Sequence, residues 1–186
     1  MATAIITGGA VRIGKALAER LAEKGYNIAL HYNGSNPDET LDRIQKAGVR
    51  GQGYPCDFVN LKDAEDLFAR IAKDFSDIEL LVNSASVFVQ ENLEQTATQT
   101  LIDTMHINLM SPYLLMREYK KRVNRGMIVN ILDERIIKNI PAFGAYSVSK
   151  AALGHLTQLA AVEWGESVRV NAIAPGLILP PRGEGE

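Results

Sequence analysis

The stretch TAIITGGAVRIG at residues 3–14 decides the fold, because it joins a β-branched run to a glycine-rich turn and the start of a helix. Thr3–Thr7 predicts a buried strand and Gly14–Lys24 predicts an amphipathic helix. Glycines let the backbone between them turn tightly and approach a ligand, and the amino end of a helix favours an anion. A strand, a glycine-rich turn and a helix in this order are typical of a dinucleotide-binding site, although an ordinary strand-to-helix turn stays open.

Outward from this stretch, short β-rich runs alternate with longer amphipathic segments. Further strands are expected at Ile28–Tyr32, Gly51–Pro55, Leu80–Asn83, Met127–Leu132 and Val168–Ile173. Further helices are expected directly after Asn36-Pro37, from Asn60 to about Phe75, and across Thr98–Val123 and Tyr146–Trp164. The alternation predicts an α/β fold, a doubly wound parallel sheet with helices on both faces that is Rossmann-like, with a ligand crevice at the carboxyl ends of the strands.

The segment from Pro175 to Glu186 carries no strand or helix signal and runs into a polar tail. The predicted sheet therefore lacks a closing unit on that edge. Since 186 residues fall within the usual length of one domain, we expect a single dinucleotide-binding domain over residues 1–186, shortened at its C-terminus.

Composition and charge exclude several classes of protein. The chain is 46% hydrophobic with a net charge of −2, which allows a packed core and gives no electrostatic reason to expect nucleic acid or a membrane as a partner. Cys56 has no second cysteine to pair with, and no signal peptide or membrane-length apolar run is visible. His31, His106 and His155 lack metal-ligand spacing. We expect a cytoplasmic protein that uses no metal and acts on a small molecule.

The end of the second predicted strand indicates which dinucleotide is bound. NAD sites usually place Asp or Glu there to bind the ribose hydroxyls, whereas this chain has His31-Tyr32-Asn33-Gly34-Ser35. A carboxylate would repel a 2′-phosphate, so its absence favours NADP, and Arg12 can supply a positive charge nearby. A solvated surface position for Arg12 is the alternative.

Tyr146 and Lys150 lie four residues apart and share one face of a predicted helix. A free tyrosine has a pKa near ~10, and a neighbouring ammonium group would lower that pKa toward neutrality. Such a pair suits proton transfer, although the same spacing also occurs on protein surfaces. By strand order, Asn83 and Asp133 at strand ends and Asn108 in the long helix could reach the same crevice.

These motifs and their order resemble the short-chain dehydrogenase/reductase family over essentially the whole chain. Within that family, three departures from the common pattern are similar to the pteridine reductases and the bacterial dihydromonapterin reductases. Arg12 replaces a frequent glycine, Asp133 stands where most relatives carry the catalytic serine, and Ser86-Val87-Phe88 replaces a glycine-containing turn.

The resemblance implies roles for individual residues. The catalytic residues would be Tyr146, Lys150, Asp133 and Asn108. The cofactor, NADPH or NADP, would be bound by Gly8, Arg12, Ile13, Gly14, His31, Asn33, Ser35, Asp57, Phe58, Asn83, Ala85, Ser86, Lys150, Pro175 and Gly176. The substrate would contact Arg12, Ser86, Phe88, Asp133 and Tyr146, with the Phe88 ring stacked on a pterin and sandwiching it against the nicotinamide.

The resemblance implies an NADPH-dependent reductase of a pterin or dihydropterin, with Tyr146 and Asp133 on the proton-donating side and Lys150 orienting the cofactor. Two alternatives stay open: a reductase of a carbonyl, such as a 3-oxoacyl thioester or a sugar ketone, and an NADP-binding protein without turnover. Asp133 distinguishes the pterin reductase from the carbonyl reductase, because carbonyl reducers usually place a neutral hydroxyl donor beside the tyrosine. Relatives of this type form tetramers through the two long helices, so a homo-oligomer is expected.

Overall fold

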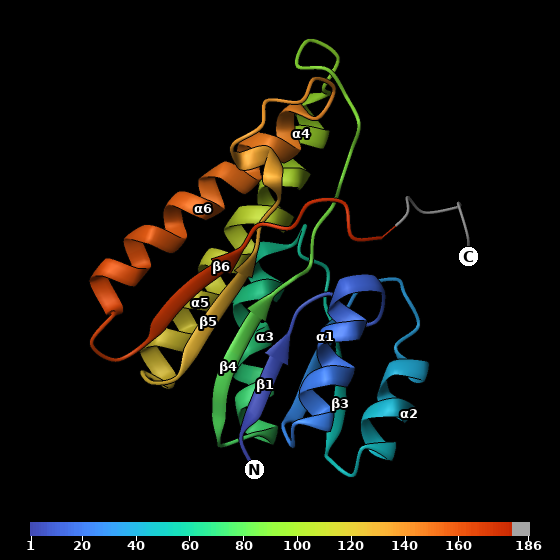
Figure 1. Cartoon of the computed structure of the whole chain (residues 1–186), viewed down its shortest axis with the longest axis vertical. Coiled ribbons are helices and arrows are strands. Elements are labelled where there is room, and N and C mark those ends of the chain that lie inside the picture. Colours follow the sequence, from blue (N-terminus) through green and yellow to red (C-terminus); the bar gives the residue numbers. More distant parts are fainter. Residues whose placement is uncertain (180–186) are drawn as a thin grey trace.

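The computed structural model describes residues 1–179, and the irregular tail expected at residues 180–186 lies outside them. Six parallel strands form one sheet in the order β3-β2-β1-β4-β5-β6 (Figure 1). The strands are β1 (Thr3–Ile6), β2 (Asn27–Tyr32), β3 (Gly51–Pro55), β4 (Ile78–Asn83), β5 (Met127–Ile131) and β6 (Arg169–Ile173). The chain starts in the middle of the sheet, winds to one edge and then returns to wind to the other, which confirms the predicted doubly wound topology.

Helices cover both faces of the sheet, as predicted. They are α1 (Arg12–Glu23), α2 (Asp38–Lys46), α3 (Leu61–Asp74), α4 (Thr98–Met105), α5 (Ser111–Arg122) and α6 (Gly144–Trp164). On one face α1 and α2 pack through small and branched side chains such as Ala18, Ala22 and Ile44. Within residues 1–179 no helix packs on the part of this face that β5 and β6 form, where Ile173 is exposed.

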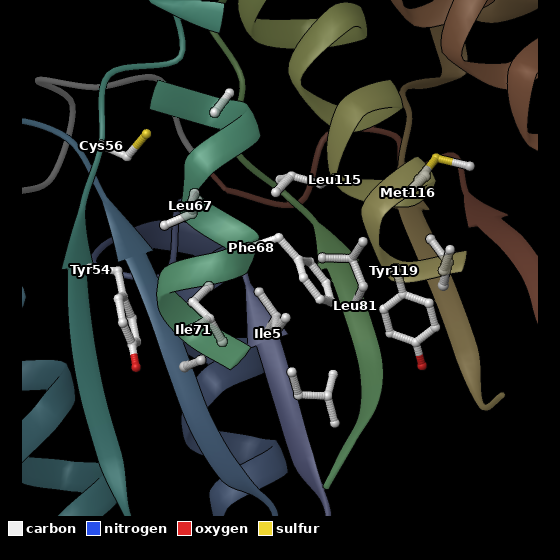
Figure 2. Packing of buried hydrophobic residues seen from close by; sticks show 14 of the residues in the cluster. Ile5, Tyr54, Cys56, Leu67, Phe68, Ile71, Leu81, Leu115, Met116 and Tyr119 are labelled. Carbon is white, nitrogen blue, oxygen red and sulfur yellow. The ribbon is translucent and has the colours of Figure 1, made fainter. Parts of the chain in front are cut away.

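The opposite face carries the larger core, under α3, α5 and α6. Leu67, Phe68 and Ile71 of α3 lie against Ile5 of β1 and Leu81 of β4 (Figure 2). All five side chains are fully buried, and each such side chain contributes about 1.5–3 kcal/mol relative to exposure. This packing fixes the central strands, and with them the positions of the strand ends that form the site.

The helix predicted across Thr98–Val123 is not continuous. A π-helical turn, η1 (His106–Met110), separates α4 from α5. The apolar spacing continues through the turn, so the sequence pattern does not reveal the extra residue that a π-turn accommodates. The turn directs the Asn108 side chain into the interior, where it is fully buried.

Two helix starts follow from local capping. Asn36 accepts a hydrogen bond from the backbone nitrogen of Asp38, the first residue of α2. Pro37 lies between these two residues, just before the helix begins. Asn60 accepts from the backbone nitrogen of Lys62 and caps α3, as predicted.

Candidate active site

The phosphate loop between β1 and α1 is folded closely on itself and on the segment after β4. Gly8 has a φ of +65°, and a Cβ there would lie 2.8 Å from the Cα of Ala85. A Cβ on Gly14 would overlap the carbonyl group of Gly8. Only glycine fits both positions, so the loop presents bare backbone at the amino end of α1, as binding of a pyrophosphate requires.

Arg12 occupies a backbone conformation that usually belongs to glycine. Its φ is 53°, in the left-handed region, which costs an ordinary residue about 1–2 kcal/mol. This strained residue lies in the wall of the cavity described below. The positive charge that the sequence indicated is therefore located at the phosphate loop.

His31 ties the phosphate loop to the neighbouring strands. Its Nδ1 accepts a hydrogen bond of 3.1 Å from the Gly8 nitrogen, and its Nε2 lies 3.0 Å from the Cys56 carbonyl oxygen. These partners require a neutral ring that carries its proton on Nε2. Burial lowers the pKa of His31 to about 4, and the ring stacks on Phe58 at 4.1 Å. Both ring nitrogens are thus used within the protein.

A cavity of about 430 Å³ runs along the carboxyl ends of the strands. Its wall is formed by residues that follow β3, β2, β1, β4 and β5, in the order of these strands in the sheet. The wall runs from Asp57 and Ser35, past the phosphate loop, to Asp133. The sequence-predicted residues in this wall are Gly8, Arg12, Ile13, Gly14, His31, Asn33, Ser35, Asp57, Phe58, Ala85, Ser86, Asp133, Tyr146, Lys150, Pro175 and Gly176. Three others, Asn83, Asn108 and Phe88, do not line it.

Tyr146 and Asp133 are in direct contact at one end of the cavity. The Tyr146 hydroxyl donates a hydrogen bond of 2.9 Å to Oδ2 of Asp133. Burial, and then the charge of Asp133, raise the pKa of Tyr146 above its ordinary value. The expectation that Lys150 would lower this pKa is therefore wrong for this structure, because burial and a carboxylate neighbour outweigh the more distant ammonium group.

Lys150 is buried beside this pair. Its Nζ donates a hydrogen bond of 2.8 Å to the Ile131 carbonyl oxygen and lies 5.8 Å from the centroid of the Tyr146 ring. Burial lowers the pKa of Lys150 to about 8. An ammonium group has three donors, so two remain for other partners in the cavity.

Asn108, which the resemblance placed among the catalytic residues, is buried and hydrogen-bonded to two neighbouring segments. Its Oδ1 accepts from the Val87 nitrogen at 2.9 Å, and its Nδ2 donates to the Val87 carbonyl at 3.0 Å and to Ser149 at 3.1 Å. These bonds hold the segment after β4 against α6, which carries Tyr146. Asn108 positions the cavity wall without forming part of it.

Asn83, predicted to bind the cofactor, also has a partner inside the protein. It donates a hydrogen bond of 2.8 Å to Asn130 of β5, and both side chains are buried. The bond joins the ends of two adjacent strands. The side chain that the sequence placed at the cofactor therefore supports the sheet beneath it.

Phe88 lies beside Tyr146 and outside the cavity wall. Its ring stacks on Phe143 at 4.6 Å and meets the Tyr146 ring edge-on at 4.7 Å, and it remains 53% exposed. The sequence reasoning did not identify Phe143, three residues before Tyr146, as the partner of Phe88.

The sequence reasoning also missed Arg135, in the 3-10 turn η2 (Glu134–Ile136). Its Nη1 lies 3.1 Å and 3.3 Å from the two carboxylate oxygens of Asp133. Its guanidinium group also lies over the rings of Phe88 and Phe143, at 5.2 Å and 4.7 Å from their centroids. In the sequence, the only sign of this contact is that Arg135 follows Asp133 by two residues, and this spacing by itself does not predict a contact.

Residues 1–179 contain no metal-binding cluster, no disulfide and no membrane-spanning helix. In residues 1–179 no group of three His, Cys, Asp or Glu side chains lies close enough together to hold a metal ion. Cys56 is free and buried. Over the same residues, every helix is too short or too polar to cross a membrane.

Comparison with known proteins places this geometry in a family. The family model described as short chain dehydrogenase matches residues 2–184. An uncharacterized oxidoreductase of Thermotoga maritima is 34% identical over 177 residues, which cover 92% of this chain and 70% of that protein. The solved FolM alternative dihydrofolate reductase 1 of Brucella canis, complexed with NADP, is 34% identical with a TM-score of 0.90, covering 97% of this chain and 75% of that one. Acetoin dehydrogenase of Enterobacter cloacae is 26% identical with a TM-score of 0.92, covering 97% and 74%.

Proposed function

The chain belongs to the short-chain dehydrogenase family and is a nicotinamide-dependent oxidoreductase, and from this premise we propose that it reduces a pterin or dihydropterin with NADPH. The contact between Tyr146 and Asp133 carries the proposal. A carboxylate occupies the position beside the tyrosine where carbonyl reducers usually place a hydroxyl donor. The similarity to the Brucella FolM reductase supports the same substrate class.

The cavity wall supports NADP as the cofactor. The phosphate loop offers backbone that only glycine permits, and Arg12 lies in the same wall. After β2 the wall carries Asn33 and Ser35 with no carboxylate between residues 31 and 35, so a 2′-phosphate meets no like charge. Bound NADPH would supply the hydride. Lys150, with two donors beyond its bond to Ile131, would hold the ribose.

Tyr146 is the proposed proton donor. Because its pKa is raised, the hydroxyl keeps its proton at neutral pH and can release it only to a strongly basic atom. Adding one hydride and one proton across a ring C=N bond reduces that bond and leaves a phenolate, which regains a proton from water. Asp133 orients the phenol between turnovers, and the half-exposed Phe88 offers an aromatic face beside it for a flat ring.

The test compares two substrates under the same conditions. NADPH oxidation is followed with dihydrobiopterin and with a 3-oxoacyl thioester, and we expect kcat/KM to be at least about tenfold higher for the pterin, a difference near ~1.4 kcal/mol. The variant Asp133→Ser restores the hydroxyl that carbonyl reducers use. It should lower pterin turnover without abolishing NADPH binding. A wild-type preference for the thioester would overturn the proposal.

A second candidate is a carbonyl reductase, which the similarity to acetoin dehydrogenase favours. It predicts thioester or sugar-ketone turnover by the wild-type protein and a gain of that activity in Asp133→Ser. A third candidate, an NADP-binding protein without turnover, predicts retained NADPH binding and no oxidation with either substrate.

We further propose that the chain is a single dinucleotide-binding domain, that copies associate into a homo-tetramer, and that the protein acts in the cytoplasm. Sedimentation of the purified chain at several concentrations tests the second.

A further inference from the structure

Arg135 binds the carboxylate of Asp133 through both its side chain and its backbone nitrogen. Its Nη1 bonds both carboxylate oxygens, and its backbone nitrogen donates a hydrogen bond of 2.9 Å to Oδ1. Oδ2 accepts the Tyr146 hydroxyl. We propose that Arg135 is a positioning residue that keeps the Asp133 carboxylate oriented as the acceptor for the Tyr146 hydroxyl.

The guanidinium group is itself fixed. It lies over the rings of Phe88 and Phe143, and among residues 1–179 its buried Nε has no hydrogen-bond partner. Side-chain exposure is 20% for Arg135 and 17% for Asp133, so water screens the pair less than it screens an exposed ion pair. A cation held this way acts on Asp133 continuously, whereas a mobile surface cation would not.

Other charged groups near Asp133 do not take over this role. From α6, Lys150 faces Asp133, but its Nζ is bonded to the Ile131 carbonyl oxygen. From η2, Glu134 pairs with Lys138 at 2.6 Å, pointing its charge elsewhere. Arg12 of the phosphate loop lies in the wall of the same cavity. The Arg135 side chain, by contrast, is bonded to both oxygens of the carboxylate.

The inference rests on the proposed function for its catalytic consequence. If Tyr146 delivers the proton, its hydroxyl must be held at one place between turnovers, and a freely rotating Asp133 would not hold it there. Loss of a charge-assisted hydrogen bond costs about 1.5–3 kcal/mol, which corresponds to about tenfold to a hundredfold in rate. The effect should fall on kcat, because Arg135 is not placed to bind NADPH.

The test uses three variants of the full chain. Arg135→Met removes the charge at similar length, Arg135→Lys keeps the charge, and Lys138→Met removes a cation three residues further along as the matched control. With dihydrobiopterin we expect Arg135→Met to lower kcat by about tenfold to a hundredfold, with KM for NADPH changed less than about threefold. Arg135→Lys should recover most of kcat, and Lys138→Met should stay within about twofold of wild type.

A second measurement does not depend on turnover. The ¹³C carboxyl signal of Asp133, identified by its absence in Asp133→Asn, is recorded at one neutral pH in each variant as a reporter of the hydrogen bonds to that carboxylate. We expect the signal to move in Arg135→Met, which loses the bonds to both carboxylate oxygens, and to stay near its wild-type position in the other two variants. An unchanged signal in folded Arg135→Met would overturn the inference and leave Arg135 a packing partner of the two rings. If wild type turns over neither substrate, the proposed function fails while this signal still decides the role of Arg135.

Discussion

Neutral contacts hold the cavity wall at the phosphate loop, whereas an ion pair holds it at the end that follows β5. The first region, which we name the loop end, consists of Gly8, Gly14 and the buried His31. The second, the proton end, consists of the ion pair between Asp133 and Arg135 and of the Tyr146 hydroxyl bonded to Asp133. Glycine contacts and a neutral imidazole hold their geometry over a wide pH range, while an ion pair holds only as long as both charges persist. The comparison suggests that binding and chemistry can be perturbed separately.

The largest effect expected is loss of turnover without loss of binding, from Tyr146→Phe at the proton end. Removing the hydroxyl takes away the proton donor, which should lower kcat by about a hundredfold to ten-thousandfold. NADPH affinity, measured by fluorescence titration, should change by no more than a few-fold, because the loop end is untouched. Tyr113→Phe, at a half-exposed position in α5, is the matched control. Equal turnover by Tyr146→Phe would remove Tyr146 from the mechanism.

The next effect concerns the loop end and depends on pH. The pKa of His31 lies at about 4, below the ordinary 6.5. Between these two pH values the unfolded chain binds a proton at His31, whereas the folded chain does not. The stabilisation by the neutral ring is therefore complete above pH 6.5 and is lost as the pH falls toward 4, by up to about 3 kcal/mol. Denaturant unfolding between these pH values measures it.

A variant identifies the source of that pH dependence. His31→Asn should be less stable at neutral pH, with a shallower fall in stability toward acid. His155→Asn, at an exposed position of α6, should keep the wild-type slope. If His31→Asn falls as steeply as wild type, the acid sensitivity comes from other groups and the loop end is not governed by His31.

The smallest effect concerns residues 31–35 beside the loop end, which contain no carboxylate. We expect NADPH to be preferred over NADH by more than about tenfold in kcat/KM, or about 1.4 kcal/mol. Asn33→Asp places a carboxylate in the cavity wall and should reduce or reverse that preference. Asn92→Asp, at an exposed loop position outside that wall, is the control. Equal use of both cofactors by wild type would contradict the roles given to Arg12 and Ser35.

The fold was predictable because its determinants are local. Most strands have their own β-rich run, several turns have glycine or a capping residue, and parallel strands joined by helices leave few topologies. All six strands and the doubly wound order follow from these signals. The π-turn at His106–Met110 does not, because its apolar residues keep helical spacing.

The candidate site was predictable as a set of residues and less so as a set of contacts. Strand order places Asp133, Tyr146 and Lys150 at one cavity. The raised pKa of Tyr146 depends on burial and on a contact between side chains 13 residues apart, which spacing cannot supply. Arg135 reaches Asp133 through a 3-10 turn that carries no strong sequence signal. His31 was expected at the cofactor, but its bond to Gly8 depends on the register of β2 beside β1, which spacing does not reveal.

The π-turn between α4 and α5 fits one extra residue into the helix while the turns on either side keep nearly the same phase. Each residue of an α-helix turns the chain by about 100°, so removing the extra residue displaces the side chains of the turn itself. Deleting one residue from His106–Met110 would let the backbone close into a regular helix, with α4 and α5 left nearly in place and the residues of the turn shifted relative to Val87. The hydrogen bonds from Asn108 to Val87 would then be lost, and the wall of the cavity would be released without any group in it being altered. A single-codon deletion in this segment should therefore be far more damaging than its partly exposed position suggests.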